Sequence, residues 1–337
     1  MKRFISLALL LMGSYNVIAQ QDELYTRLES LNVQPTFPEN LLKTRTVILY
    51  RVSPKRRSPS IRGDWKVLTN KIQPTLKKSG IDAVLHYYLE DLLSGTEAYK
   101  SFLDYFDDRD VKNAVFVSEL DGNYTITIAE LQDRQYLLKD GQEAWQIQGT
   151  DLENMLNNIY RAIANSGLEK ENMLILETAE LGEMISPIKA KRNEFYDLNF
   201  SSEKLAVPIH PDSAEIRLAL DNYPYKWGFV DASIPEKDLR IQGYQYVLYY
   251  VNTIGRSAKQ ILEYKTTDVE TSYISEMMVN GKLAVESYNV NTPVYKFYIK
   301  HIYSGNIFLG KRWDAAPSKG GALKNYVANL SNELVKN

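Results

Sequence analysis

The first half of the chain alternates short apolar runs with longer segments of helical periodicity. Val47-Ile48-Leu49-Tyr50 is a continuous apolar run of the kind found in strands buried on both faces of a parallel sheet. An Asp-Gly pair at residues 121–122 fits the left-handed turn of a β-hairpin. The order of elements predicts an α/β domain with a mixed sheet at residues 44–177. The expected strands are 44–52, 82–89, 113–120, 123–131 and 172–177, and the expected helices are 63–78, 91–106 and 150–166.

The pattern becomes clear again from Gly243 onward. Asn280-Gly281 and Ser304-Gly305 are turn signals, and each is flanked by strand-like segments. Residues 243–337 are therefore predicted to form a second α/β domain that is rich in hairpins. Its expected elements are a strand over 244–252, a helix over 256–264, hairpins over 272–290 and 293–313, and a closing helix over 323–335 with Leu323, Val327, Leu330 and Leu334 on one face.

The segment between the two domains, residues 178–242, has a weaker pattern. It is punctuated by prolines, which cannot donate to a sheet ladder. We interpret it as an extended connection that carries one or two strands, such as residues 214–220. The prolines are Pro187, Pro208, Pro211, Pro224 and Pro235.

The N-terminus has the features of a secretory signal. Lys2 and Arg3 precede a short apolar run, and Val17-Ile18-Ala19 places small residues where a signal peptidase cleaves. Cleavage is expected after Ala19, which leaves a polar lead-in over residues 20–43. No later segment is long and apolar enough to cross a membrane. The mature protein is therefore expected in the periplasm or outside the cell, with no membrane span.

Composition narrows the chemistry. The 337 residues carry a formal net charge of -2, which argues against a general nucleic-acid partner because phosphate neutralisation needs a basic excess. The chain has no cysteine, so disulfides, thiolate metal sites and cysteine nucleophiles are excluded. His86, His210 and His301 lie far apart, and they suggest no catalytic triad. No cofactor and no metal site are expected.

A basic loop follows the first strand and is the strongest candidate for a ligand site. In open α/β sheets, ligands bind beyond the carboxyl ends of the strands, where a phosphate, a carboxylate or an acidic surface can dock. The alternative is a solvated loop without a ligand. The candidate anion-binding residues are Lys55, Arg56, Arg57 and Arg62.

Acidic residues give weaker signals. Asp107, Asp108 and Asp110 offer oxygen ligands, but the segment lacks the glycine and the distal glutamate of a calcium loop. Glu90 and Asp91 are sequence neighbours that point in different directions, so a catalytic carboxylate pair is not expected. We interpret Asp91 as a helix cap.

The 24 tyrosines are the unusual feature of the composition. Tyrosine combines apolar area with a hydrogen-bonding hydroxyl, which suits contacts to proteins, peptides and sugars. Tyr246, Tyr250 and Tyr298 are the candidate partner-contact residues. The alternative, which the pattern favours, is that these rings pack within the sheet.

Residues 305–311 match the spacing of a phosphate-binding P-loop as far as Lys311, but Arg312 stands where the magnesium-binding Ser or Thr belongs. The segment also follows a turn and resembles a strand, so a hairpin is expected here. Residues 295–315 and the junction Val17-Ile18-Ala19-Gln20-Gln21 resemble uncharacterised exported proteins of Bacteroidota-type bacteria. Some of those proteins carry an "NTPase" label, which the departure at Arg312 does not support here.

Two functions remain open from the sequence. The first is an exported, non-catalytic binding or accessory protein of the cell envelope with an envelope protein as its partner. It rests on the signal segment, the tyrosines and the lack of a complete catalytic motif. The second is a nucleotide- or phosphate-binding protein, or a hydrolase, whose site is the basic loop at residues 55–64.

Overall fold

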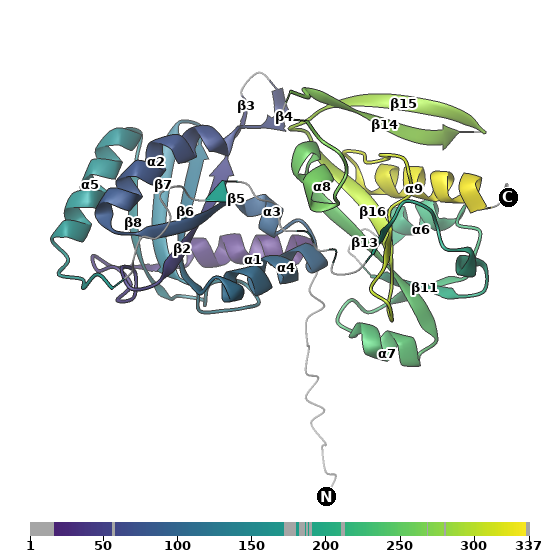
Figure 1. The fold of residues 1–337 in the computed structure, drawn as a ribbon, viewed down its shortest axis with the longest axis horizontal. Coiled ribbons are helices and arrows are strands. Elements are labelled where there is room, and N and C mark those ends of the chain that lie inside the picture. Colours follow the sequence, from purple (N-terminus) through teal and green to yellow (C-terminus); the bar gives the residue numbers. More distant parts are fainter. Residues whose placement is uncertain are drawn as a thin grey trace, which may run out of the picture.

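The computed structural model describes residues 17–55, 58–171, 180–181, 186, 188, 191–209, 213–267, 269–279 and 281–334. The molecule has two lobes, each built around its own mixed β-sheet with helices on both faces (Figure 1). The predicted α/β class with two mixed sheets is confirmed. None of the helices in the described part of the chain is both long and apolar enough to cross a membrane.

The first lobe contains a seven-stranded sheet in the order β1-β8-β7-β6-β2-β5-β9. The interior strand β2 is almost entirely buried and pairs in parallel with β5 on one side and β6 on the other, as its continuous apolar run predicts. Strands β6, β7 and β8 follow as antiparallel neighbours. The strands are β1 (Asn32–Val33), β2 (Arg45–Val52), β5 (Asp82–Tyr88), β6 (Val111–Leu120), β7 (Asn123–Glu130), β8 (Glu143–Gly149) and β9 (Glu180–Leu181).

Helices cover both faces of this sheet. Helices α2 (Trp65–Ser79) and α5 (Leu152–Ala164) enclose one apolar core with Ile48, Tyr50 and neighbouring strand residues. Helices α1 (Val17–Glu29) and α4 (Thr96–Asp108) cover the opposite face, together with the short helix α3 (Leu89–Leu92). Helix α2 begins and ends as predicted, because Asp64 accepts a hydrogen bond from the Lys66 amide and Gly80 adopts the left-handed conformation.

The second lobe contains a six-stranded sheet in the order β10-β17-β16-β13-β11-β12. Strands β13 and β16 pair antiparallel over nine residues, whereas β11 is parallel to both β12 and β13. These strands are β10 (Arg192–Asn193), β11 (Lys204–Pro208), β12 (Trp227–Val230), β13 (Tyr244–Ile254), β16 (Pro293–His301) and β17 (Ile307–Phe308).

Helices cover both faces of this second sheet as well. Helices α6 (Ser213–Leu220) and α9 (Lys319–Leu334) pack on one face, and α7 (Glu236–Ile241) and α8 (Gly255–Ile261) pack on the other. A separate hairpin of β14 (Ser272–Val279) and β15 (Lys282–Asn289) lies beside α9 (Figure 1). The predicted hairpin at residues 272–290 and the predicted closing helix are confirmed, and α9 begins four residues earlier than expected.

The interpretation of residues 178–242 as an extended connection is wrong for its described part. Strands β10, β11 and β12 from this segment join the second sheet, so the second lobe begins well before Gly243. Residues 214–220, expected as a strand, belong to helix α6. The prolines do not interrupt these elements, because Pro208 is the last residue of β11 and Pro235 is the N-cap of α7.

Other predictions have mixed outcomes. Gly95 divides the helix expected over 91–106 into α3 and α4. The lead-in over 20–43 contributes α1 and the edge strand β1 to the first lobe. The strand expected over 172–177 lies outside the described residues.

Candidate functional site

A groove of about 370 Å³ opens on the first sheet beside α1, which crosses the sheet in purple in Figure 1. It lies over the carboxyl-terminal halves of the parallel strands β2 and β6, and Leu89, directly after β5, borders it. This is the edge at which open α/β sheets bind ligands. Its volume falls within the range of about 300–1,000 Å³ that is typical of small-molecule sites.

The groove has an apolar floor and a polar margin. Leu49 and Phe116 are buried strand residues that form part of the floor, while Tyr25 and Leu28 form a wall on α1. The polar lining residues are Glu29, Arg51, Ser118, Thr125, Thr127, Gln146 and Gln148.

Arg51 is the cation of the groove. Its guanidinium lies over the Tyr25 ring, 4.1 Å from the ring centre, and this cation–π contact fixes the end of a flexible side chain. Within the described part of the chain, Arg51 forms no ion pair and no hydrogen bond. Its N–H donors are therefore available to a carboxylate or phosphate, which a guanidinium binds with two parallel hydrogen bonds.

The far side of the groove carries a row of amides and hydroxyls on β7 and β8. Gln146 donates to the Thr127 hydroxyl at 2.9 Å, and Gln148 donates to the Gln146 amide oxygen at 2.9 Å. These bonds orient the two glutamines and leave further donors and acceptors on both amides. The arrangement favours a ligand that has hydrogen-bonding groups in addition to an anionic end.

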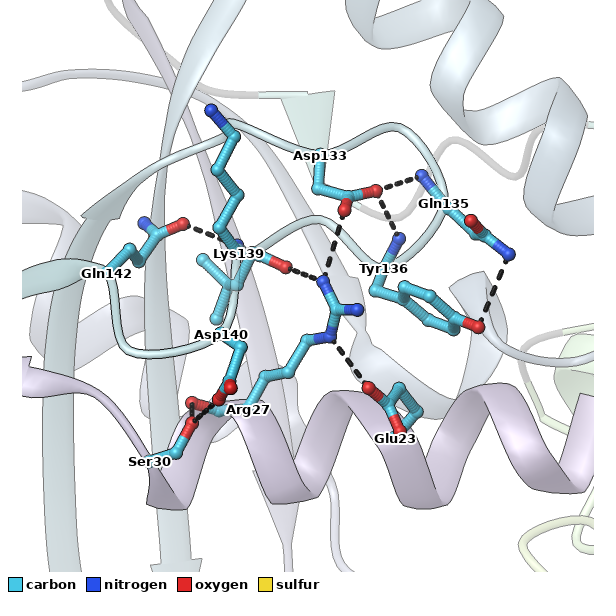
Figure 2. A network of polar contacts seen from close by, with 10 residues as sticks. Glu23, Arg27, Ser30, Asp133, Gln135, Tyr136, Lys139, Asp140 and Gln142 are labelled. Carbon is cyan, nitrogen blue, oxygen red and sulfur yellow. Dashed lines mark hydrogen bonds and ion pairs between the residues drawn. The ribbon is translucent and has the colours of Figure 1, made fainter.

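The helix that forms the wall of the groove is held in place by Arg27 (Figure 2). On α1, Arg27 pairs with Glu23 at 3.0 Å. Across to the loop after β7 it pairs with Asp133 at 3.1 Å and donates to the Leu138 carbonyl. Its guanidinium also lies 4.0 Å from the centre of the Tyr136 ring. Because α1 is tied to the loop in this way, the groove wall is preformed rather than assembled by a ligand.

The basic loop predicted as an anion site is only partly described. Lys55 lies in strand β3 (Pro54–Lys55), which pairs with β4 (Ser58–Arg62), and Arg56 and Arg57 lie outside the described residues. Arg62 forms an ion pair with Glu90 at 3.1 Å. Burial raises the pKa of Glu90, and the nearby Arg62 partly offsets that rise. Arg62 is thus paired directly with an acid within the protein, whereas Arg51 acts on Glu90 only at longer range.

Asp91 has a different place from the one expected. It is not a helix cap but a buried residue within α3, and it connects the two lobes. Thr253 donates to one carboxylate oxygen at 2.6 Å and Ser257 to the other at 3.1 Å. Burial raises the pKa of Asp91 to about 7, although both hydroxyl hydrogen bonds act in the opposite direction.

The spaces beside Asp91 are small. One is lined by Arg62, Tyr88 and Glu90, the other by Asp64, Trp65 and Asp91 among other residues, and each has a volume of about 60 Å³. Such volumes hold a few water molecules rather than an organic substrate. This region therefore forms the junction of the lobes, and the groove is the candidate ligand site.

The three candidate partner-contact tyrosines are core residues. Tyr246, Tyr250 and Tyr298 are 1%, 7% and 2% exposed, so they do not form an exposed contact surface. Tyr246 packs edge-on against Phe200 at 4.5 Å and donates to Asp197 at 3.0 Å. The alternative interpretation, that these rings pack within the sheet, therefore describes Tyr246.

The remaining motifs are structural. Residues 305–311 form the turn and second strand of the expected hairpin, with Gly305 at φ 70° and β17 antiparallel to β16. His86 is buried between Tyr50 and Gln73, which lie at 3.0 Å from its two ring nitrogens. Burial lowers the pKa of His86 to about 3. His210 lies outside the described residues, and the described chain contains no cluster of three or more His, Asp or Glu suited to a metal.

Comparison with known proteins adds no relative. No protein-family model matches the chain, and no curated protein matches it.

Proposed function

We propose that the protein is an exported, non-catalytic binding protein of the bacterial cell envelope, and that its groove beside α1 holds a small anionic ligand with an apolar body. The observation that carries the ligand proposal is Arg51, whose guanidinium lies at an apolar floor without an ion pair or hydrogen bond from the described chain. Along the other side, hydrogen bonds are supplied by Thr125, Thr127, Gln146 and Gln148. Among the described residues, the lining contains no histidine, lysine or aspartate, and its one carboxylate, that of Glu29, is exposed at the margin. The groove therefore offers no buried acid or base, which favours binding over acid–base chemistry.

Export is part of the proposal and rests on the signal segment at residues 1–19. Cleavage after Ala19 leaves Leu24, Tyr25 and Leu28 in the mature chain. Leu24 is buried in the core of the first lobe, and the other two residues line the groove. Removal of the signal is therefore compatible with the groove. N-terminal sequencing of the protein from a periplasmic fraction tests this part.

The ligand proposal is tested with a panel of aromatic carboxylates, N-acylated amino acids and sugar phosphates, by thermal shift and calorimetry. A saturable shift that is lost in Arg51→Gln and kept in Arg62→Gln supports the groove. A shift lost in Arg62→Gln and kept in Arg51→Gln supports the second function, a phosphate site at residues 55–64. If no member of the panel binds the wild-type protein, the proposal of a small anionic ligand is contradicted.

An envelope protein partner remains a proposal that the buried tyrosines do not support. Cross-linking in intact cells followed by isolation of the envelope fraction tests it. Reproducible recovery of one envelope protein supports the partner, and recovery of the chain alone contradicts it.

A further inference from the structure

The hairpin of β14 and β15 has one edge that is hydrogen-bonded to the rest of the second lobe and one edge that faces solvent. The two strands pair antiparallel from Ser272↔Asn289 to Val279↔Lys282 without a shift in register. In Figure 1 β15 is the outer strand at the top of the second lobe, and β14 lies between it and α9. Only β15 therefore presents its outer edge to solvent.

The outer edge of β14 is already bonded to the rest of its lobe. The Glu276 amide donates to the Trp313 carbonyl at 2.7 Å, and the Met278 amide donates to the Asn329 side chain at 3.1 Å. Asn329 in turn donates to the Glu276 carbonyl at 2.9 Å. In antiparallel pairs, residues alternate between bonding inward and bonding outward. Glu276 and Met278 bond away from β15, and their partners on β15 are Val285 and Leu283. Val285 and Leu283 therefore direct their own N–H and C=O groups away from β14, toward the outer edge of the hairpin.

These outward groups have no partner within the described chain, and the exposed charges on this edge strand, Lys282 and Glu286, are of opposite sign. Neither proline nor a bulge interrupts β15, although such devices are common at exposed strand edges. Three apolar side chains share one face of the hairpin and are 58%, 53% and 59% exposed, namely Ile274, Leu283 and Val285. A regular strand with free backbone groups and an exposed apolar face is suited to pairing with another strand.

The charges on β15 point to a second copy of the same strand. In an antiparallel pair centred on Ala284, Lys282 of each copy lies opposite Glu286 of the other copy, and Leu283 lies opposite Val285. Lys282 and Glu286 are exposed, and Tyr288 donates to one oxygen of Glu286. The same register pairs outward-bonding residues with one another, as an antiparallel ladder requires.

Neighbouring registers lack this match. Centring the pair on Val285 places Lys282 opposite Tyr288 and Glu286 opposite Ala284, so no charges meet. Centring it on Glu286 brings two like charges together. A register centred between two residues, with Ala284 opposite Val285, pairs an inward-bonding residue with an outward-bonding one. The sequence of β15 is thus self-complementary about Ala284.

We propose that two copies of the chain associate through antiparallel pairing of β15 about Ala284, which joins their hairpins into one four-stranded sheet. This interface belongs to the second lobe and is independent of the groove in the first. It uses backbone hydrogen bonds for attraction and the two Lys282–Glu286 pairs for register.

Cysteine cross-linking tests the register directly, because the natural chain contains no cysteine. In the proposed dimer the two copies of residue 284 form a pair without mutual hydrogen bonds, whose Cα atoms lie about 4.5 Å apart. That separation is within the disulfide range of about 4.4–6.8 Å. Full-length Ala284→Cys should form a covalent dimer under mild oxidation. Ser287→Cys, exposed on the same strand but distant from its copy, should remain monomeric. No dimer from Ala284→Cys, or equal dimer from both variants, would overturn the proposal.

Charge exchange tests the contact in the uncross-linked protein, by sedimentation over a concentration series. Lys282→Glu and Glu286→Lys should each reduce the dimer fraction, and the double exchange should restore it. Val285→Pro removes an outward N–H and no hairpin bond, so it should give a monomer with an unchanged melting temperature. A dimer that survives Val285→Pro, or a wild-type chain that is monomeric at the highest concentration, contradicts this interface.

Discussion

The carboxylate of Asp91 in the first lobe accepts a 2.6 Å hydrogen bond from the hydroxyl of Thr253 in the second lobe. Next to it, the Asn252 amide donates to the Ser94 carbonyl at 2.7 Å, so backbone and side chains join the lobes at the same point. An alanine Cβ at Gly95 would lie only 2.6 Å from the Tyr250 carbonyl oxygen, and such a contact requires a residue without a side chain. The lobes therefore meet at a fitted surface that contains a titratable group.

The stability of the protein should depend on pH through Asp91. Its pKa is raised from 3.8 to about 7 in the folded state, so the folded protein binds the proton more tightly than the unfolded chain. The free energy of unfolding should therefore fall as pH rises from about 4 to about 7, and the contribution of this group is constant above that range. At about 1.4 kcal/mol per pKa unit, the loss is on the order of 4 kcal/mol.

Asp91→Asn provides the comparison for this pH dependence. The amide cannot ionise and can still accept from Thr253, so its free energy of unfolding should fall less between pH 4 and pH 8 than that of the wild type. Urea unfolding at several pH values measures the difference, with the exposed Asp108→Asn as control. Parallel curves for wild type and Asp91→Asn would show that Asp91 does not titrate in this range.

The buried ion pair of Lys296 and Asp314 should be costly to break from one side. The two side chains are 2.8 Å apart and essentially inaccessible, and Lys296 also donates to the Leu309 carbonyl. Burial lowers the pKa of Lys296 and raises that of Asp314, while each group opposes the shift of the other. Lys296→Met should destabilise the protein by about 3–5 kcal/mol, because it leaves an unpaired buried carboxylate.

A double-mutant cycle separates the charge effect from packing. Adding Asp314→Asn to Lys296→Met removes the stranded charge and keeps an acceptor for Asn329, which donates to Asp314 at 3.0 Å. The double variant should therefore recover part of the lost stability in urea unfolding. If the two losses simply add, the pair is not coupled and the explanation is wrong.

Loss of Arg27 should make α1 more mobile and weaken ligand binding in the groove, although Arg27 does not line the groove. Arg27→Met removes two ion pairs, a bond to a carbonyl and a cation–π contact, and should cost about 1–3 kcal/mol. Hydrogen exchange in α1 should rise, and any ligand found for the groove should bind more weakly. Arg134→Met is the matched control, because Arg134 also pairs with two acids but is 63% exposed. Equal effects in both variants would contradict the role of Arg27.

Elements with strong local signals could be predicted from the sequence. The turn at Asp121-Gly122 forms as expected, with φ values of 53° and 81°, because few residue pairs adopt this conformation easily. Residues 214–220 illustrate the opposite case. A short apolar segment fits a strand or a helix, and contact with α9 favours the helix. Strand β8 was not predicted, because its place depends on pairing with β7 and on no local pattern.

The groove could not be predicted for the same reason. Gln146 and Gln148 lie on the unpredicted strand β8, and Tyr25 reaches the groove only because α1 crosses the sheet. Arg51 did carry a signal, as a charged residue directly after the apolar run Val47–Tyr50. The basic loop was predicted as an anion site from its cluster of basic residues, yet one of its arginines, Arg62, forms an ion pair with Glu90. Sequence reveals charge, but the pairing of charges is a property of the fold.

Helix α9 should be essential to the second lobe. Leu323, Tyr326 and Leu330 are buried against the sheet, and the Tyr326 hydroxyl donates to the Phe308 carbonyl at 2.7 Å. Truncation after Asp314 should therefore give insoluble or protease-sensitive protein. Leu330→Ala, which leaves a cavity, should cost about 2–5 kcal/mol in urea unfolding. Lys324→Ala, on the exposed face of the same helix, should change stability by less than about 0.5 kcal/mol. A soluble truncated protein with an unchanged melting transition would show instead that α9 is peripheral.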